Sequence, residues 1–308
     1  MANVSFVLPA YKARYLRESI KSILSQTYRE YELIVVDDCS PEDIRIIVEE
    51  FKDERIRYYR NDHNIGSSRG LVAAWNHAVS YASGEWLVLA SDDDVYKPEF
   101  LREMLNLKDR YPNVRAVHCR MAATDPDGSW RWAGCGRPEL ESQIEMAHDL
   151  VLRDCQQRVS DFMYHRQTLL DKGGFVDLPL GWYADGATAI MMSENGVAYS
   201  PKVLFEWRCS DINISLKTDN LVQKLWAVEA YKKWLSNRIG EFEPKSELDA
   251  LLLEQLRSKA SDSFWGTIYH LLGQMKFMDW LRCMRYFPYT TNRKLRLIKA
   301  RIKMVLAR

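Results

Sequence analysis

Residues 84–94 read GEWLVLASDDD. The apolar run at 86–90 has the length and composition of a buried strand, and it leads directly into Asp92, Asp93 and Asp94. Three adjacent carboxylates repel one another, and burying them unpaired is costly, so a cation is their natural partner. Carboxylate oxygens suit Mn²⁺ or Mg²⁺, which share a substrate diphosphate with their protein ligands. The alternative is an exposed acidic turn.

The chain around this stretch alternates between the strand period and the helix period. The expected strands are 4–8, 33–36, 55–59, 86–90 and 114–118, and the expected helices are 15–26, the segment opened by Ser40-Pro41, 67–81 and 97–110. This alternation predicts an α/β fold with a mostly parallel sheet and right-handed crossovers. Ligands of such sheets bind beyond the carboxyl ends of the strands.

Three short segments that can contact a ligand follow these strands: Pro9-Ala10-Tyr11, Asp37-Asp38 and Asp92-Asp93-Asp94. We expect all three groups at one edge of the sheet, because parallel strands end on the same side. Asp38 can accept a hydrogen bond from a ribose or a base there, unless the acidic pair only caps the following helix.

A fourth polar group lies at 64–69. Gly66 permits close backbone approach, Ser67 is expected to cap the helix at 67–81, and Arg69 can reach a phosphate or a base. The alternative is an ordinary strand-to-helix turn with Arg69 as a solvated surface charge.

The pattern loosens after Arg120. We expect a loop or hairpin at 121–140, a strand at 161–166, a short helix at 167–171, a helix at 185–195 and helices throughout 216–287. The expected organisation is therefore one α/β domain at 1–215, with halves at 1–120 and 121–215, followed by a helical region at 216–308.

Composition limits the classes of function. The 308 residues are 47% hydrophobic with a net charge of +1, so no global field attracts nucleic acid. No apolar run is long enough to span a bilayer, and no signal peptide is recognisable at the start. The six cysteines form no C-x-x-C pair, which argues against zinc and favours a reducing, cytoplasmic setting.

These residues also carry a family resemblance. The chain is similar to the inverting glycosyltransferases of family 2, which have the GT-A fold, over residues 3–105. The matching runs are VSFVLPAYKARYLRESIKSILSQTY (4–28), ELIVVDDCS (32–40) and NDHNIGSSRGLVAAWNHAVSYASGEWLVLASDDDVYKPEFL (61–101). A weaker match continues through 173–175, Asp185 and 208–215.

The resemblance implies roles for individual residues. Tyr11 would pack against the base of a nucleotide, usually uracil, and Asp38 would hydrogen bond to it. The implied nucleotide-binding set is Pro9, Ala10, Tyr11, Asp38, Asn64, Gly66, Arg69 and Asp92. Asp93 and Asp94 match the closing acids of the family's D-x-D-D pattern, which implies a site for Mn²⁺ or Mg²⁺.

The chain departs from the family pattern at three positions. Ser91 stands where many members have the first acid, so which two of the three following acids hold the metal stays open. Asp185 matches the catalytic base, although Ala184 replaces the usual preceding glutamate. Ser210 stands where many members have a histidine. Arg208, Ser210 and Trp182 remain candidates for contact with phosphate or acceptor, and Trp130 and Trp132 are candidates for an acceptor platform or for ordinary packing.

The implied reaction moves a sugar from a nucleotide-diphospho-sugar, usually a UDP-sugar, to an acceptor hydroxyl with inversion. The expected acceptor is a saccharide or lipid-linked saccharide in polysaccharide, O-antigen or other surface glycan synthesis. A homo-oligomer is compatible with the sequence. Because Ser91 and Ser210 replace residues of the family pattern, an alternative is a catalytically degenerate protein of the same fold that binds a nucleotide sugar without transferring it. The run IVVDD (34–38) also resembles the acidic pair of signalling receiver domains. In a receiver that pair follows the first strand, whereas in this chain a full strand and a helix precede the strand that ends in Asp37-Asp38.

The C-terminal segment is a separate feature. From Arg293 onward there are seven basic residues and no acidic ones, and Leu295, Ile298, Ile302, Val305 and Leu306 share one helical face. This pattern predicts a basic amphipathic helix that can lie on anionic lipid at the inner face of the membrane. The alternative is a helix docked on its own domain or on a second subunit.

Overall fold

The computed structural model describes residues 3–213, 217–218, 220–287, 289 and 291–306, and the side chains of 286, 300 and 303–306 are outside this description. Ser215 and the side chains of Val305 and Leu306 therefore lie outside the described residues. The strands are β1 Val4–Ala10, β2 Tyr31–Asp37, β3 Ile56–Arg60, β4 Trp86–Leu89, β5 Val95–Tyr96, β6 Ala116–Thr124, β7 Trp130–Ala133, β8 Leu140–Glu141, β9 Phe162–His165 and β10 Val197–Arg208.

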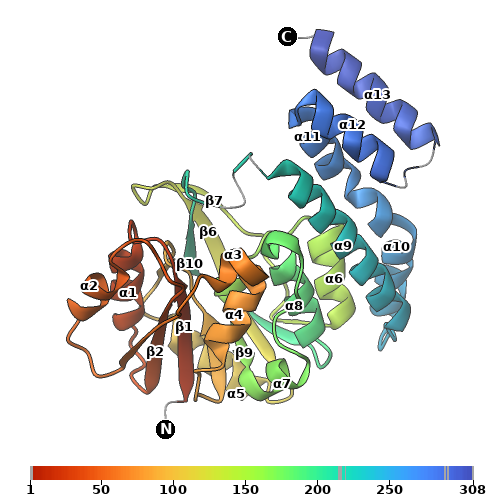
Figure 1. The fold of residues 1–308 in the computed structure, drawn as a ribbon. Coiled ribbons are helices and arrows are strands. Elements are labelled where there is room, and N and C mark those ends of the chain that lie inside the picture. The colour runs from red at the N-terminus through yellow and green to blue at the C-terminus, as the bar shows by residue number, and fades with distance from the viewer. Residues whose placement is uncertain (1–2, 214–216, 219, 288, 290, 307–308) are drawn as a thin grey trace.

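Helices cover both faces of the sheet and extend beyond it (Figure 1). The α-helices are α1 Leu16–Leu24, α2 Ile44–Glu49, α3 Ile65–Arg69, α4 Leu71–Val79, α5 Phe100–Arg110, α6 Gln143–Val151, α7 Arg166–Asp171, α8 Ala184–Met192, α9 Leu221–Glu241, α10 Glu247–Ser263, α11 Trp265–Gln274, α12 Phe277–Tyr286 and α13 Thr291–Leu306. Two short 3-10 helices are η1 Val159–Asp161 and η2 Pro179–Gly181.

The strands of the described residues form one sheet, whose main path is β3-β2-β1-β4-β9-β6-β10-β5. β2 and β4 run parallel to β1 on its two sides, and β3 runs parallel to β2. β9 is antiparallel to both β4 and β6, and β10 returns parallel to β6. The predicted GT-A-type fold, a largely parallel sheet flanked by helices with a C-terminal helical extension, is confirmed.

The alternation of side chains along the central strand explains the two cores. In β1, Val4, Phe6 and Leu8 face the core covered by α1, α2 and α5, whereas Val7 faces the core covered by α4 and α8. A strand that is buried on both faces reads as a nearly continuous apolar run, which is why 4–8 could be recognised from the sequence.

Several expected elements differ in detail. The helix expected from Ser40-Pro41 begins only at Ile44. The Ser40 hydroxyl accepts from the Glu42 amide at 3.0 Å and donates to the Tyr11 carbonyl at 2.6 Å. The helix expected at 67–81 divides into α3 and α4 at Gly70. The φ of Gly70 is 104°, which is incompatible with a right-handed α-helix. Ser67 does not cap it, because the side chain of Asn64 accepts the hydrogen bond from the Ser67 amide.

The second half of the sheet holds elements that the sequence pattern did not reveal. The region expected as a loop or hairpin contains the end of β6 and its antiparallel partner β7, so the hairpin is confirmed. The long strand β10 and the helix α6 were not predicted. β10 contains Pro201 between two buried stretches, and its register shifts near that point, which obscures the strand period.

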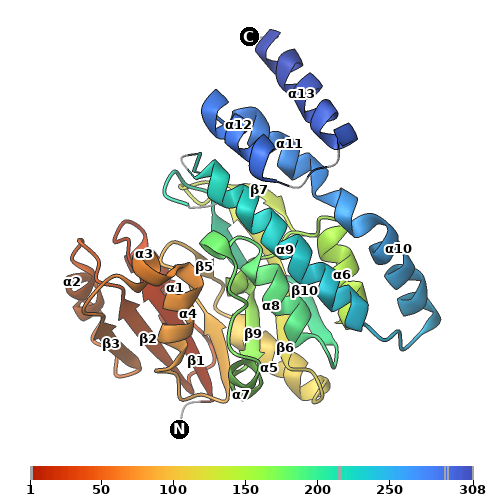
Figure 2. The same cartoon turned by 45° about the vertical axis from the view of Figure 1, so that its right-hand side comes forward.

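The C-terminal helices share the core of the first part of the chain. One continuous apolar cluster runs from Val7 through α4, α8 and α9 to Leu297 of α13. α10 packs against α6, and α9 packs against η2. Figure 2 shows α9 and α10 against the sheet domain, with α11, α12 and α13 standing above it. Among the described residues, no helix combines the length and apolarity needed to cross a bilayer.

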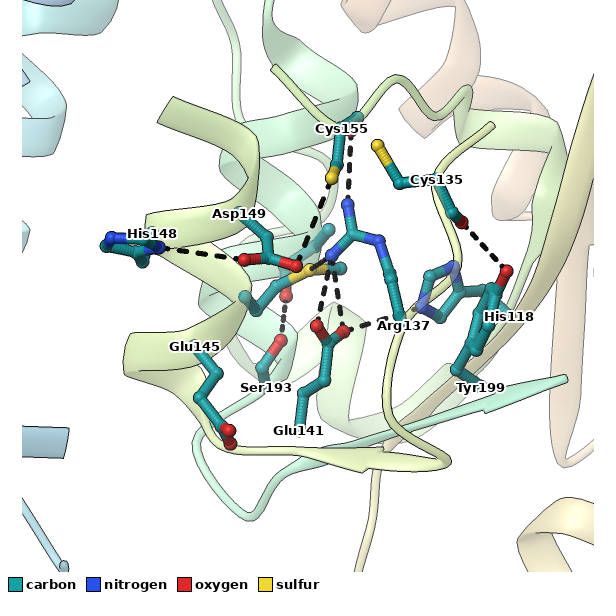
Figure 3. A network of polar contacts seen from close by, with 12 residues as sticks. His118, Cys135, Arg137, Glu141, Glu145, His148, Asp149, Cys155, Ser193 and Tyr199 are labelled. Carbon is teal, nitrogen blue, oxygen red and sulfur yellow. Dashed lines mark hydrogen bonds and ion pairs between the residues drawn. The ribbon is translucent and has the colours of Figure 1, made fainter. Parts of the chain in front are cut away.

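A buried polar network holds the segment between β7 and β8 in place (Figure 3). The Arg137 guanidinium contacts the Glu141 carboxylate at 3.2 Å and donates to the Cys155 carbonyl at 3.1 Å. The side chains of Arg137 and Glu141 are almost inaccessible to solvent. The Tyr199 hydroxyl donates to the Cys135 carbonyl at 3.0 Å. These contacts tie the segment after β7 to β10 and to the end of α6.

Candidate active site

The carboxyl ends of β1, β2 and β4 meet at one rim of the sheet, as expected from their parallel order (Figure 1). The Asp38 amide donates to the Ala10 carbonyl at 3.0 Å, which joins the end of β2 to the end of β1. Pro9 and Ala10 belong to β1 itself, and Ala10 is buried. The prediction that the polar groups after these strands converge is confirmed.

Asp92 anchors the loop that follows β1. Its Oδ2 accepts hydrogen bonds from the amides of Tyr11 at 2.9 Å and Lys12 at 2.8 Å. Burial and, next, the adjacent Asp93 raise the pKa of Asp92 to about 6. One oxygen of this carboxylate therefore holds the loop after β1, whereas Asp93 and Asp94 are bonded to Ser91, Asn213 and the Arg208 amide.

Asp93 and Asp94 form a buried acidic pair, and the hydroxyl of Ser91 lies within hydrogen-bond distance of a carboxylate oxygen of each. Asp93 also accepts from the Asn213 side-chain amide at 3.0 Å and lies 4.0 Å from the Lys12 ammonium. Burial and, next, Asp93 raise the pKa of Asp94 to about 8. Two acids this close in a buried place favour a bound cation.

The pair fits a hard divalent cation that takes further ligands from elsewhere. Within the described residues, no group of three or more His, Cys, Asp or Glu side chains is arranged to hold a metal ion. A cation at Asp93 and Asp94 would thus complete its coordination with water and with oxygens of a bound diphosphate, as Mg²⁺ commonly does.

Arg208 supports this acidic pair from β10. Its backbone amide donates to Asp94 at 2.9 Å, and its Nε donates to the Asp93 carbonyl at 3.0 Å. Its two terminal nitrogens donate to the Pro126 carbonyl and to the Glu18 carboxylate. The guanidinium is thus engaged by protein acceptors, and its contact with phosphate stays a prediction.

Ser210 and Asn213 extend the same support. Asn213 Oδ1 accepts from the Ser210 amide at 2.6 Å, while its Nδ2 reaches Asp93. Sequence reasoning passed over Asn213, although it lies inside the 208–215 segment that drew attention. An amide side chain among strand-end acids is a weak signal, because asparagine is equally common in turns.

Asp38 holds the amino end of α3. Its carboxylate accepts from the amides of Ile65 and Gly66, both at 2.8 Å, and from the Asn61 side chain at 2.7 Å. A Cβ at Gly66 would lie 3.1 Å from Asp38 Oδ2, so a larger residue would crowd this contact. The expected bond between Asp38 and a base stays a prediction, now with most of the carboxylate already occupied.

Other members of the expected nucleotide set remain accessible. The ring of Tyr11 is 42% exposed, and Arg69 is exposed at the end of α3. Among the described residues, Arg69 has no hydrogen-bond or ion-pair partner. Asn64 is committed to capping α3, so its side chain is less available to a ligand than that of Arg69.

Asp185 occupies the first turn of α8, where the helix dipole favours a carboxylate. The preceding Tyr183 has a left-handed φ of 67°, and its ring stacks on Tyr231 of α9 at 4.7 Å. Burial raises the pKa of Asp185, and the positive charge of Arg158 opposes this effect. The C-terminal helices thus help to place the residue that the resemblance implies is the base.

Arg158 was not predicted from the sequence, yet it lies close to both parts of the site, the acids after β4 and Asp185 of α8. It immediately precedes η1, which contacts both β4 and α8. Its guanidinium lies 3.9 Å from the ring centre of Trp207. Its positive charge partly opposes the rise that burial causes in the pKa of Asp94 and of Asp185.

The candidate tryptophans occupy different places. Trp130 and Trp132 are exposed on β7, and the Trp130 indole donates to Glu206 at 3.0 Å. Trp182 precedes α8 and lies 5.2 Å from the Lys224 ammonium. Trp130 and Trp132 are therefore open to a ligand, whereas Trp182 is partly covered.

Comparison with known proteins gives one family match. The model of "Glycosyl transferase family 2" matches residues 5–171. A β-1,3-glucosyltransferase of Escherichia coli, WfgD, named for UDP-Glc and α-D-GlcNAc-diphosphoundecaprenol, is 38% identical over 94 residues, which are 30% of this chain and 36% of that protein. A putative teichuronic acid biosynthesis glycosyltransferase of Bacillus subtilis, TuaG, is 33% identical over 33% of this chain and 40% of that protein. The matched part is thus well under half of each relative.

Solved structures share the fold at low identity. The Staphylococcus aureus protein TarS (residues 1–349), in complex with UDP-GlcNAc, has a TM-score of 0.67 at 17% identity and covers 92% of this chain and 80% of that chain. The mannosyltransferase PcManGT of Pyrobaculum calidifontis, in complex with GDP-Man and Mn²⁺, has a TM-score of 0.58 at 18% identity. The match covers 98% of this chain and 87% of that chain.

Proposed function

The chain belongs to glycosyltransferase family 2, and we propose that it transfers a sugar from a UDP-sugar to an acceptor hydroxyl with inversion at the anomeric carbon. The observation that carries the proposal is the arrangement at the end of β4. Asp92 is bound to the loop after β1, while Asp93 and Asp94 form a separate acidic pair beside that loop. A nucleotide on the loop and a cation on the pair would meet at the diphosphate.

The donor would lie across the ends of β1 and β2. Tyr11 offers an exposed ring for stacking on the base, and Arg69 offers a guanidinium for phosphate or base. Pro9, Ala10, Asp38, Asn64 and Gly66 would lie beneath it, at the ends of β1 and β2 and at the start of α3. UDP is favoured over other nucleotides because WfgD is named for UDP-Glc and TarS was solved with UDP-GlcNAc, whereas PcManGT was solved with GDP-Man.

Asp93 and Asp94 would hold Mn²⁺ or Mg²⁺. When bound, the metal would neutralise the negative charge that grows on the departing nucleoside diphosphate. Lys12, 4.0 Å from Asp93, would add a second positive charge on the same side. Arg208, Ser210 and Asn213 would keep the two carboxylates oriented rather than touch the substrate.

Asp185 would remove the proton from the acceptor hydroxyl as it attacks. A base works best when its pKa is closer to the working pH, and burial raises the pKa of Asp185 in that direction. Arg158 would keep Asp185 ionised before the acceptor arrives. General base help of this kind contributes about 10²–10⁴-fold to the rate.

The acceptor would be a saccharide of a surface glycan, carried on a lipid. This part of the proposal draws on the names of WfgD and TuaG, which refer to a diphosphoundecaprenol-linked sugar and to teichuronic acid. Exposed Trp130 and Trp132 on β7 offer faces on which a sugar ring can stack, with Trp182 nearer to Asp185.

Two variants test the assignment and serve as controls for each other. Asp185→Asn should lower kcat by about 10²–10⁴-fold while leaving Mn²⁺-dependent UDP binding nearly unchanged, because the base acts only on the acceptor. Asp93→Asn should weaken Mn²⁺-dependent UDP binding in calorimetry. Near-normal kcat in Asp185→Asn would show that Asp185 is not the base, and a lack of any transfer from labelled UDP-sugars by the unmodified chain would favour a nucleotide-sugar-binding protein that does not react.

A further inference from the structure

The last helix docks on the protein through only one side. Leu297 of α13 is buried, with 2% of its surface exposed. The Arg301 guanidinium donates to the carbonyls of Gly273 at 2.7 Å and Met275 at 2.8 Å, at the end of α11. These contacts fix which side of α13 faces the rest of the chain.

An apolar stripe lies on the side of α13 turned away from this contact. Leu295, Ile298 and Ile302 follow the spacing of one helical face and are 50%, 38% and 53% exposed. An amphipathic helix that belongs only to its own domain would bury such a stripe and expose its charges. Here the three side chains of the stripe keep between 38% and 53% of their surface in solvent.

Basic side chains border the stripe on both edges. Lys294 lies beside Ile298 on one edge, and the exposed Arg296 and Lys299 lie on the other. Residues 280–308 contain nine basic residues and no acidic one. An apolar stripe between cationic edges is the pattern of a helix that lies in the interface of an anionic bilayer.

The preceding helix adds to the same end of the molecule. Phe277, Met278 and Leu281 of α12 are exposed, as are the basic Lys276 and Arg285. In both views α11–α13 stand above the level where β1 and β2 end, which is the rim that carries Asp38 and Asp92–Asp94 (Figures 1 and 2). A surface bound by these helices would thus lie on the active-site side of the molecule.

We propose that the exposed faces of α12 and α13 bind an anionic phospholipid bilayer, with the Leu295, Ile298 and Ile302 stripe inserted at the headgroup level. A second copy of the chain is a poorer occupant, because pairing the stripe with itself would bring Lys294, Arg296 and Lys299 against their own counterparts with no acid between them. Binding to a bilayer is argued from α12 and α13 alone. Only its purpose, which is to bring the active site to a lipid-linked acceptor, rests on the proposed function.

Sedimentation of the full chain with sucrose-loaded vesicles tests the proposal without any donor or acceptor. The chain should bind vesicles of three parts phosphatidylcholine to one part phosphatidylglycerol, and bind phosphatidylcholine alone much more weakly. The variant Leu295→Gln/Ile298→Gln/Ile302→Gln should bind the anionic vesicles at least about tenfold more weakly. The variant Lys294→Gln/Arg296→Gln/Lys299→Gln should lose about fivefold for each basic residue removed.

A matched control comes from α10, where Leu248 and Leu251 are as exposed as the stripe. Leu248→Gln/Leu251→Gln should bind vesicles like the unmodified chain. Unchanged binding by the stripe variant would overturn the proposal. So would an unmodified chain that ignores vesicles but forms a dimer, measured by light scattering, that the stripe substitutions dissociate. UDP-sugar transfer to a water-soluble acceptor should be unaffected in all variants, which separates failure of this inference from failure of the proposed reaction.

Discussion

Replacing Arg208 with lysine separates a positioning role from direct contact with the substrate. The Arg208 side chain is buried, and its three nitrogens donate to the carbonyls of Asp93 and Pro126 and to the Glu18 carboxylate. The family resemblance alone suggests a contact with phosphate or acceptor, whereas the geometry favours support of the Asp93 peptide. Lysine keeps the charge but can satisfy only part of this set.

The structure sets the size of the expected effect. Lysine has no Nε donor, so the buried bond to the Asp93 carbonyl would be lost, and leaving a buried acceptor unpaired costs about 1–3 kcal/mol. It would also lose the guanidinium face that lies 4.4 Å from the Tyr15 ring centre, worth about 0.5–1 kcal/mol. We therefore expect Arg208→Lys to lower the free energy of unfolding by about 1.5–4 kcal/mol, measured by urea denaturation.

Arg14 provides the matched control, because it contacts the same Tyr15 ring at 5.0 Å and pairs with Asp211 at 2.7 Å. Both partners of that ion pair are solvent-exposed, and such pairs contribute about 0–1 kcal/mol. Arg14→Lys should therefore unfold almost like the unmodified chain. If Arg208→Lys also kept full stability while its KM for the donor rose, Arg208 would be a substrate ligand and the positioning argument would be refuted.

Two further predictions concern the interior of the second half. Arg137→Met should lower the free energy of unfolding by about 3–5 kcal/mol, because it leaves the buried Glu141 carboxylate without its guanidinium partner and with only the His118 ring, 3.9 Å away, beside it. Arg137→Met/Glu141→Leu should recover most of that loss in urea denaturation; a double variant no more stable than the single one would contradict this. His118 is buried against Phe162, and burial lowers its pKa to about 4 from an unfolded value near 6.5. Below pH 6.5 only the unfolded state takes up this proton, so His118 should reduce stability by about 1 kcal/mol at pH 5.5 relative to pH 7.5, and by more toward pH 4. The comparison with His118→Phe isolates this contribution, and equal pH dependence in both proteins would contradict it.

The first half of the fold could be predicted because its signals are local. β1, β2 and β4 are buried on both faces, so each reads as an apolar run, and each is followed at once by its polar residues. In the second half, the strand at 161–166 was predicted and is present as β9, but its antiparallel place was not, because that place depends on neighbours far away in the chain. β10 was missed because it contains Pro201 and its register is shifted. The pattern of side chains within β9 or β10 does not indicate which strands they pair with.

The sequence by itself determined that the loop beginning at 9–11 and the acids at 37–38 and 92–94 meet at one edge, because parallel strands end on the same side of the sheet. Only the tertiary structure decided what each side chain does there. It binds Asp92 to the loop after β1, occupies Asp38 with the start of α3, and engages Arg208 with backbone carbonyls. It also turned the apolar stripe of α13 outward. The physical reason is that hydrogen-bond partners and buried faces are set by residues that are distant in sequence, about which a local pattern carries no information.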